Sequence, residues 1–188
     1  MSESAVATEF PILPTDRLLM RAVSMDDVSS IRALLGITEV TRYSNIPDSP
    51  TEEQAIELVR NMSELYQSGN GCAWIIEDRL SHAFVGVFRF NWFHKPWKCG
   101  GIGYELHPSV WGRGVMTEAL RAAIRCGHDT FGLNRIEAWT LPGNGASDRV
   151  LEKGGFRYEG TLRQKAWFKG AFHDFRVFGR VTDDALCE

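Results

Sequence analysis

The sequence predicts one α/β domain, of the α+β kind, in which about four helices flank a β-sheet. Short segments with alternating apolar residues recur along the chain and are typical of strands. Longer segments carry apolar residues at helical spacing. A chain of 188 residues with 44% hydrophobic content is also large enough for a single sizeable core. We therefore expect residues 1–188 to form one domain, with residues 1–12 as a flexible N-terminal arm.

The N-terminal half predicts a strand, two helices and then an antiparallel meander of three strands. The helices are expected at residues 25–35 and 51–68. The second helix starts with a capping box, because Thr51 follows Pro50 and precedes Gln54 by three positions. The expected strands of this half are residues 17–23, 73–77, 84–93 and 98–106.

The C-terminal half predicts a central helix, then a strand, a second helix and two final strands. The central helix, residues 114–131, combines good helix formers with apolar residues at helical spacing. Its apolar positions are Met116, Leu120, Ala123, Ile124, Gly127 and Phe131. The remaining elements are expected as a strand at 135–140, a helix at 144–153, and strands at 156–168 and 172–181.

The turn between a strand at 101–108 and the central helix contains Gly112 and Gly114. Two glycines allow a tight path with positive φ, and the amides of residues 113–117 then point out of a helix start with partial positive charge. A phosphate or diphosphate fits such a site. The residues around Gly114 match neither a Walker A loop nor a dinucleotide-binding fingerprint. A turn that holds no ligand is the alternative.

Short motifs follow one another along nearly the whole chain. They are residues 15–21 (TDRLLMR), 102–108 (IGYELHP), 111–114 (WGRG), 117–120 (TEAL), 144–147 (NGAS), 152–156 (EKGGF), 159–163 (EGTLR) and 170–174 (GAFHD). By their order and spacing the chain resembles the GNAT acyl-CoA N-acyltransferases, and within them the RimJ and RimL type of ribosomal-protein N-terminal acetyltransferase. The resemblance implies a GNAT fold, with a mixed, mostly antiparallel twisted sheet that splays into a V between residues 101–106 and 135–140.

The resemblance also implies that acetyl-CoA binds in the V and that coenzyme A is a product. The pantetheine arm is expected along residues 105–107 and beside Asn144, and the diphosphate on the amides of residues 113–117. Two departures from the family pattern are Met116, where a glycine or alanine is expected, and Gly101, where relatives often carry an acid. The implied cofactor-binding residues are Leu106, His107, Trp111, Gly112, Arg113, Gly114, Val115, Met116, Thr117, Asn144 and Ser147.

In such an enzyme an amine attacks the thioester directly, so the site must hold both reactants, accept a proton and protonate the leaving thiolate. Glu159, carried over from the Glu-Gly segment of the branch, is the first candidate base, and Glu105 is the second. Their structural alternatives are a salt bridge for Glu159 and a solvated strand carboxylate for Glu105. Ser147 is the candidate proton donor, with helix capping as its alternative role. Tyr104 and Tyr158 are lesser acid candidates.

The acceptor is expected to be a primary amine, in the first place the α-amine at a protein N-terminus. Small amines such as antibiotics or polyamines are alternatives, and so is a non-catalytic acyl-CoA sensor. The expected acceptor walls are Tyr43 and Asn45, between the first two helices, and Trp92 and Trp97 in a run of aromatic and basic residues. A polyamine site should gather acids, and those near the first wall are Glu39, Asp48, Glu52 and Glu53.

Charge and cysteine usage indicate a cytoplasmic protein that binds neither nucleic acid nor membrane. The net charge of -3 and the pI near 6.0 give no general attraction to nucleic acid or anionic lipid. The four cysteines are widely spaced and no leader-like segment opens the chain, so we expect reduced thiols. The histidines form no metal-binding pattern, so we expect no metal. The expected oligomeric state is a monomer or a homodimer.

Overall fold

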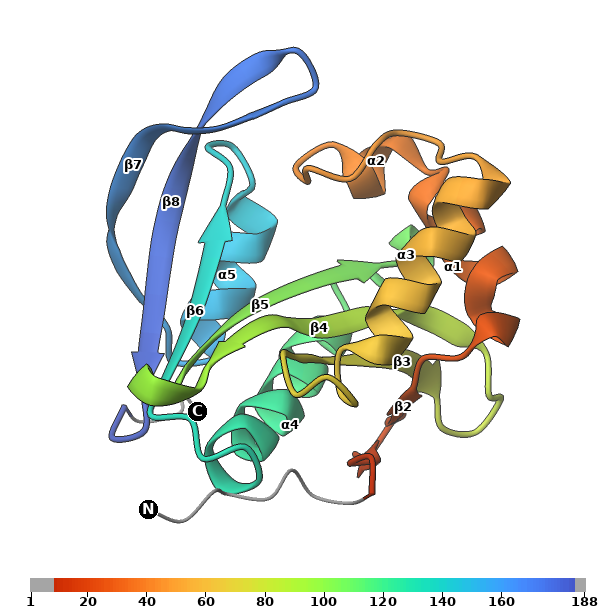
Figure 1. The fold of residues 1–188 in the computed structure, drawn as a ribbon, viewed down its shortest axis with the longest axis horizontal. Coiled ribbons are helices and arrows are strands. Elements are labelled where there is room, and N and C mark those ends of the chain that lie inside the picture. The colour runs from red at the N-terminus through yellow and green to blue at the C-terminus, as the bar shows by residue number, and fades with distance from the viewer. Residues whose placement is uncertain (1–8, 185–188) are drawn as a thin grey trace.

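The computed structural model describes residues 9–184, whose strands form one continuous mixed sheet (Figure 1). Neighbouring strands are antiparallel except β5 and β6, which are parallel. In their order across the sheet, the strands are β1 (Leu13–Pro14), β2 (Leu18–Ala22), β3 (Cys72–Asp78), β4 (Phe84–His94), β5 (Cys99–Leu106), β6 (Arg135–Thr140), β8 (Ala171–Val181) and β7 (Arg157–Phe168).

Helices cover both faces of this sheet. Two of them, α1 and α3, lie on one face, whereas α4 and α5 lie on the other (Figure 1). Short 3-10 turns occur at residues 25–27, 95–97 and 108–110. The α-helices are α1 (Val28–Leu35), α2 (Thr38–Thr41), α3 (Glu52–Glu64), α4 (Val115–Asp129) and α5 (Gly145–Lys153).

Two hydrophobic cores fill the space between the sheet and the helices, one on each face of the sheet. The strand β3 is therefore buried on both of its faces. Trp74 and Ile76 belong to the core around α4, whereas Ala73 and Ile75 belong to the core beneath α1 and α3. Each of these four side chains is at most 2% exposed. Side chains that alternate along a strand point to opposite faces, so one strand serves both cores.

The parallel strands β5 and β6 are paired over only three residues each, from Cys99 with Arg135 to Gly101 with Glu137. Beyond this point β5 stays with β4 and β6 stays with β8, so the two parts of the sheet diverge (Figure 1). The predicted V is therefore confirmed. Within residues 9–184, no strand pairs with the β6 side of residues 102–106. Such an open edge presents backbone polar groups that a ligand can satisfy.

The predicted helices and strands are all present, with shifts of a few residues at their ends. The capping box is confirmed, because the Gln54 amide donates to Thr51 Oγ1 at 3.3 Å and the Thr51 amide donates to Gln54 Oε1 at 2.9 Å. Besides the short 3-10 turns, two observed elements go beyond the prediction. The helix α2 has only four residues, two of them threonines with low helix propensity. The strand β1 has two residues, one of them Pro14.

Residues 9–12, the last part of the expected N-terminal arm, pack against the domain. The ring of Phe10 packs edge-on against Tyr66, with 5.1 Å between ring centroids. The carbonyl oxygen of Pro11 accepts a hydrogen bond of 2.7 Å from Trp74 Nε1. Because Trp74 is fully buried, its indole N–H needs a partner, and this segment supplies it. Residues 1–8 lie outside the described part of the chain.

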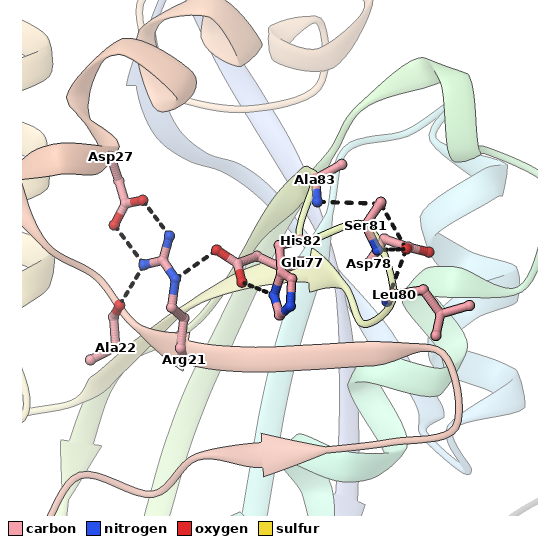
Figure 2. A network of polar contacts seen from close by, with 9 residues as sticks. All are labelled: Arg21, Ala22, Asp27, Glu77, Asp78, Leu80, Ser81, His82 and Ala83. Carbon is pink, nitrogen blue, oxygen red and sulfur yellow. Dashed lines mark hydrogen bonds and ion pairs between the residues drawn. The ribbon is translucent and has the colours of Figure 1, made fainter.

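An ion-pair network ties β2 to the start of α1 (Figure 2). The guanidinium of Arg21 donates to both carboxylate oxygens of Asp27, at 2.7 and 2.9 Å, and to Glu77 on β3 at 2.7 Å. Both carboxylates are buried, and Asp27 also accepts a bond of 2.8 Å from the amide of Ser24. Arg21 therefore compensates two buried charges and fixes the start of the helix that leads into α2.

Candidate active site

The loop before α4 has the backbone geometry that its glycines predict. Gly112 has a φ of 73° and Gly114 a φ of 74°, in a region that other residues rarely adopt. Gly114 precedes the first turn of α4, and no described side chain caps that turn. The amides of the turn therefore present the positive end of the helix dipole at the surface, where an anion can bind them.

Arg17 and Glu118 fasten this loop to the N-terminal strands. Arg17 Nη1 donates to the carbonyl oxygen of Arg113 at 3.0 Å, and Arg17 Nη2 lies 2.7 Å from Glu118 Oε2. Glu118 Oε1 also accepts a bond of 2.6 Å from the Thr15 hydroxyl. Burial alone would raise the pKa of Glu118, but the bonds from Thr15 and Arg17 outweigh it and hold this pKa below its ordinary value. The charged carboxylate therefore anchors Arg17 beside the loop.

A cavity of about 480 Å³ extends from this loop to the N-terminus of α5. Its walls are α2 and the residues that follow it, the end of β5, the loop itself and the first turns of α4 and α5. Sites for small ligands in proteins range from roughly 300 to 1,000 Å³. The cavity is therefore large enough to hold part of a cofactor together with a small acceptor group.

Most of the residues expected to bind the cofactor line this cavity, but two do not. His107 turns toward Ser109, with 2.8 Å between Nδ1 and Oγ, and its amide donates to the carbonyl of Val85. Arg113 directs its carbonyl to Arg17. The expected residues that do line the cavity are Leu106, Trp111, Gly112, Gly114, Val115, Met116, Thr117, Asn144 and Ser147.

The two large residues of the loop leave the cavity open. Met116 is 5% exposed, and its side chain belongs to the hydrophobic core around α4. Trp111 lies at the surface, and its Nε1 donates to the carbonyl oxygen of Leu106 at 2.7 Å. Met116, the first departure from the family pattern, is therefore accommodated in the core. Trp111 joins the loop to the end of β5.

A hydroxyl pair lies inside the cavity, where β5 faces α5. Tyr104 Oη and Ser147 Oγ are 2.7 Å apart, and the Ser147 amide donates to Asn144 Oδ1 at 3.3 Å. Asn144 therefore caps α5 and places Ser147 opposite the strand. Burial raises the pKa of Tyr104 well above its ordinary value, so its phenol keeps its proton at neutral pH. The sequence ranked Tyr104 low because Tyr104 shares the apolar face of the strand with Ile102 and Leu106, which is typical of a core residue.

Glu105 also lines the cavity, and it is held in a buried ion pair. Both of its oxygens accept from Arg89 on β4, one of them at 2.8 Å from Nη2. Arg89 Nε in turn donates to Asn91 Oδ1 at 3.1 Å. The Glu105 side chain is only 6% exposed, so the solvated carboxylate that formed its alternative is excluded. The pair fixes one oriented carboxylate at the edge of the V.

Glu159, the first candidate base, is not among the residues that line the cavity. Its carboxylate accepts two hydrogen bonds from Arg135, at the start of β6, where β5 and β6 are still paired. The hydrogen bonds from Arg135 lower the pKa of Glu159. Arg135 Nε also donates to Glu137 at 2.7 Å. Glu159 therefore takes the role of its structural alternative, a salt bridge, although with Arg135 and not with the arginines near it in sequence.

Of the four residues expected to form the acceptor walls, only Tyr43 lines the cavity. Asn45 is exposed beside it. The indole of Trp92 covers Gly101, where an added Cβ would lie 2.3 Å from Trp92 Nε1. Trp97 is 77% exposed in the turn before β5, roughly 20 Å from the cavity end of that strand at about 3.3 Å per residue. The two tryptophans therefore border the closed end of the V.

The packing around Gly101 also explains the second departure from the family pattern. Any side chain at this position would collide with the Trp92 indole, so an acid cannot occupy it without displacing that ring. A β-bulge between Phe90 and Trp92 sets this register, because it places two residues of β4 opposite one residue of β5. A carboxylate that acts in this site must therefore come from elsewhere, and Glu105 is the one that lines the cavity on β5.

Together these features fit an acyl-CoA thioester. The uncapped amides of α4 suit its diphosphate, and the open edge at residues 102–106 suits the amide groups of its pantetheine arm. The hydroxyls of Tyr104 and Ser147 lie farther along the same cavity, where a thioester can receive a hydrogen bond.

The cysteines of the described residues are unsuited to nucleophilic chemistry. Cys72, Cys99 and Cys126 are all buried free thiols. Burial raises the pKa of Cys99 and of Cys126 to about 11, and that of Cys72 further still. They are therefore protonated at neutral pH and far less nucleophilic than thiolates. Cys187 lies outside the described part of the chain.

Residues 9–184 contain no cluster of three or more histidine, cysteine, aspartate or glutamate side chains with metal-binding geometry. Across the same residues, every helix is too short or too polar to cross a membrane.

Comparison with known proteins identifies the family. The Acetyltransferase (GNAT) domain family matches residues 17–157. An uncharacterized N-acetyltransferase, YoaA of Bacillus subtilis, is 36% identical over 172 residues, which cover 92% of this chain and 97% of YoaA. The ribosomal-protein-serine acetyltransferase of Escherichia coli is 30% identical over 135 residues, covering 71% of this chain and 73% of that protein.

Solved structures agree with this assignment at the level of the fold. RimL, a ribosomal L7/L12 alpha-N-protein acetyltransferase solved in complex with coenzyme A, superposes with a TM-score of 0.84 at 24% identity. The match covers 92% of this chain and 99% of RimL. The V-shaped sheet, the glycine loop before α4 and the extent of these matches lead to one conclusion: the chain belongs to the GNAT family of acetyltransferases and is an N-acetyltransferase.

Proposed function

We propose that this protein transfers the acetyl group of acetyl-CoA to the α-amine at the N-terminus of a protein. The observation that carries the proposal is the single cavity that joins the uncapped start of α4 to the hydroxyls of Tyr104 and Ser147. Bound acetyl-CoA supplies an activated acetyl group as a thioester. The rest of the chemistry, which is positioning and proton transfer, belongs to the residues of this chain.

The loop before α4, residues 111–114, is called the phosphate-binding loop below; together with the edge of β5 it would hold the cofactor. Gly112 and Gly114 let the backbone approach a diphosphate closely, and the amides of the first turn of α4 would donate to its oxygens. Arg17 holds the loop in this shape through the Arg113 carbonyl. The open backbone edge at residues 102–106 would pair with the pantetheine arm.

Tyr104 would donate the proton that the departing sulfur requires. Its raised pKa keeps Oη protonated at neutral pH, and Ser147 Oγ, 2.7 Å away, fixes the direction of the phenol. This phenol could act as the donor because it would be held next to the sulfur, so that the proton moves as the C–S bond breaks. The proton that the amine loses after its attack would return to Tyr104 by relay through Ser147 Oγ, so the proton balance closes.

Glu105 would bind and orient the amine. A free α-amine has a pKa near ~8, against ~10.4 for a lysine side chain, so part of it is neutral at physiological pH and needs orientation more than a strong base. Since no strand of residues 9–184 covers this edge of β5, the gap connects the Glu105 face of the sheet with the Tyr104 face. The amine can therefore reach the thioester from the Glu105 side.

The distribution of acids favours an α-amine over a polyamine. Of the four acids near the first acceptor wall, Glu39 alone lines the cavity. Asp48 is paired with Lys169 at 2.7 Å, and Glu52 lies 3.7 Å from Arg32. The relation to the E. coli ribosomal-protein-serine acetyltransferase supports a protein N-terminus as the acceptor. The buried, protonated thiols suit the reducing cytoplasm as its place of action.

Mass spectrometry of acetylated products tests the proposal. The protein is incubated with acetyl-CoA and peptides that start with serine or alanine, with N-terminally blocked peptides that contain lysine, and with spermidine. We expect acetyl groups on the free peptide α-amines alone. Acetylation of spermidine but no peptide would reject the protein acceptor. Binding of acetyl-CoA without acetylation of any amine would reject catalysis and favour an acyl-CoA sensor.

A further inference from the structure

A second cavity, of about 800 Å³, lies beside the first one. The two cavities share Gly114, Thr117 and Lys153, so the second begins where the phosphate-binding loop ends. The residues before β2 and one exposed side of α4 form its other walls. Cationic side chains outnumber acidic ones there. The cations are Arg17, Arg79, Arg121, Arg125 and Lys153, and the acids are Asp16 and Glu118.

Some of these cations are occupied by partners within the protein. Arg17 is paired with Glu118, and Arg79 Nη1 donates to the carbonyl oxygen of Thr15 at 2.8 Å. In contrast, the side chains of Arg125 and Lys153 form no ion pair or hydrogen bond with any residue between positions 9 and 184. Both groups are at the surface, where they can meet a ligand. The cavity therefore has positive charge that the protein itself does not neutralise.

The arginines on α4 that line the second cavity lie in a row along the helix. Thr117, Arg121 and Arg125 recur every fourth residue, so they lie on one side of α4, with successive positions about 6 Å apart along the helix axis. The row starts in the turn that would bind the diphosphate and leads away from it. Lys153, at the end of α5, lines both cavities. A ligand that leaves the loop on this side would meet Arg125 and Lys153.

We propose that the second cavity binds the 3′-phosphate of coenzyme A, and that Arg125 and Lys153 recognise it. This inference rests on the proposed function, because the same cofactor would occupy both cavities. Besides its diphosphate, coenzyme A carries a phosphate monoester on its ribose, with a charge of about −1.5 to −2 at neutral pH. Backbone amides suit the diphosphate, whereas long cationic side chains suit an exposed monoester. The protein would thus select coenzyme A over its 3′-dephospho form.

Calorimetric titration with coenzyme A and with 3′-dephospho-coenzyme A tests this inference directly. The wild type should bind coenzyme A about tenfold more tightly, as expected for one charge-assisted contact. The double variant Arg125→Gln/Lys153→Gln should lose most of this preference by binding coenzyme A more weakly, with little change for the dephospho form. Arg125→Lys keeps the charge and should keep the preference. Arg60→Gln, an exposed arginine on α3, is the matched control and should match the wild type.

The outcomes separate this inference from the proposed function. Equal affinity of the wild type for the two ligands would overturn the 3′-phosphate site and leave the proposed function standing. Equal weakening of both ligands in the double variant would also overturn it, because the two cations would then act on the shared part of the cofactor. If the wild type bound neither ligand, the proposed function itself would fail. Circular dichroism of each variant checks that the fold is kept.

Discussion

Tyr104 and Ser147 are 43 positions apart in the chain, yet their hydroxyl oxygens are 2.7 Å apart in the cavity. Tyr104 stacks on Phe88 on the buried face of β5, and Asn144 caps the helix that carries Ser147. Packing and capping therefore fix both hydroxyls before any ligand binds. Such preorganisation makes a weak acid effective, because its proton is already aimed at the site of reaction.

Replacement of Tyr104 by phenylalanine should reduce kcat by about a hundredfold, the lower end of what general acid catalysis contributes. The ring and its packing remain, so the affinity for acetyl-CoA should stay the same. Steady-state kinetics and calorimetry measure the two effects separately. Tyr158→Phe is the control, because Tyr158 is half exposed and its hydroxyl contacts Thr161, outside the cavity. An unchanged kcat in Tyr104→Phe would show that the proton comes from another group.

Replacement of the two candidate carboxylates, Glu105 and Glu159, should have clearly different effects on kcat/KM. Glu105→Gln should lower kcat/KM for the peptide by roughly ten- to hundredfold, because the amine loses a charged hydrogen-bond partner. Glu159→Gln removes a carboxylate of the same kind that faces Arg135 and should leave kcat/KM unchanged within about twofold. The reverse pattern would return the role of base to Glu159.

At the level of elements, the hairpin of β7 and β8 is held over the V at its tip. Figure 1 shows the tip reaching toward α2. Lys169 Nζ donates to Asp48 Oδ1 at 2.7 Å and to the carbonyl oxygen of Thr41 at 2.8 Å. Most of β7 is exposed, so few other contacts hold the hairpin. The contact of Lys169 joins the hairpin tip to the wall of the cavity that carries Tyr43.

Replacement of Lys169 by methionine should let the hairpin tip open more often. Amide hydrogen exchange in residues 164–172 should become about two- to fivefold faster, the effect expected from loss of an exposed ion pair. Lys165→Met, in the same hairpin, removes a lysine that makes no ion pair within the described residues and is the matched control. Equal exchange in the two variants would show that the tip is held by other contacts.

The network at Arg21 should make the stability of the N-terminal elements depend on pH. Burial raises the pKa of Asp27, but the hydrogen bonds from Arg21 and Ser24 outweigh it, so the pKa lies below the ordinary 3.8. A lowered folded pKa stabilises the protein above the unfolded pKa, and this contribution is lost as the pH falls through the folded pKa. Asp27→Asn should therefore reduce the free energy of unfolding by about 2 kcal/mol at neutral pH.

Denaturant titrations at several pH values check this prediction. The difference between the wild type and Asp27→Asn should be constant down to about pH 5 and should shrink below pH 3.8. Asp26→Asn changes the exposed neighbouring carboxylate and should have little effect at any pH. A difference that persists unchanged at low pH would mean that Asp27 acts through packing and not through its charge.

For the whole molecule, the features that can be predicted from the sequence are those that depend on residues close together in the chain. The turn at Gly112 and Gly114 needs positive φ, and the helix after it follows from its apolar period, so both can be predicted from the sequence. The Thr51 cap is local in the same way. The V required the family resemblance, because it depends on how far β5 and β6 stay paired.

The candidate site was harder to predict because its contacts cross several strands. Glu159 on β7 forms an ion pair with Arg135 on β6, across the strand β8 that lies between them. No spacing in the sequence indicates this pair. The partner of Glu105 depends on the register of β4 and β5, and the bulge before Trp92 directs that indole over Gly101. The functional role of each acid therefore depends on the assembled sheet.

The central claim, that the loop before α4 binds the cofactor, is tested most directly by calorimetric titration of acetyl-CoA. The wild type is compared with Gly112→Asp and Gly132→Asp. Both glycines have positive φ, and an added Cβ at either would meet no described atom within 4 Å, but only Gly112 lines the cavity. We predict micromolar binding to the wild type and to Gly132→Asp, and its loss in Gly112→Asp. Equal binding to all three proteins, or no binding to the wild type, would contradict the claim.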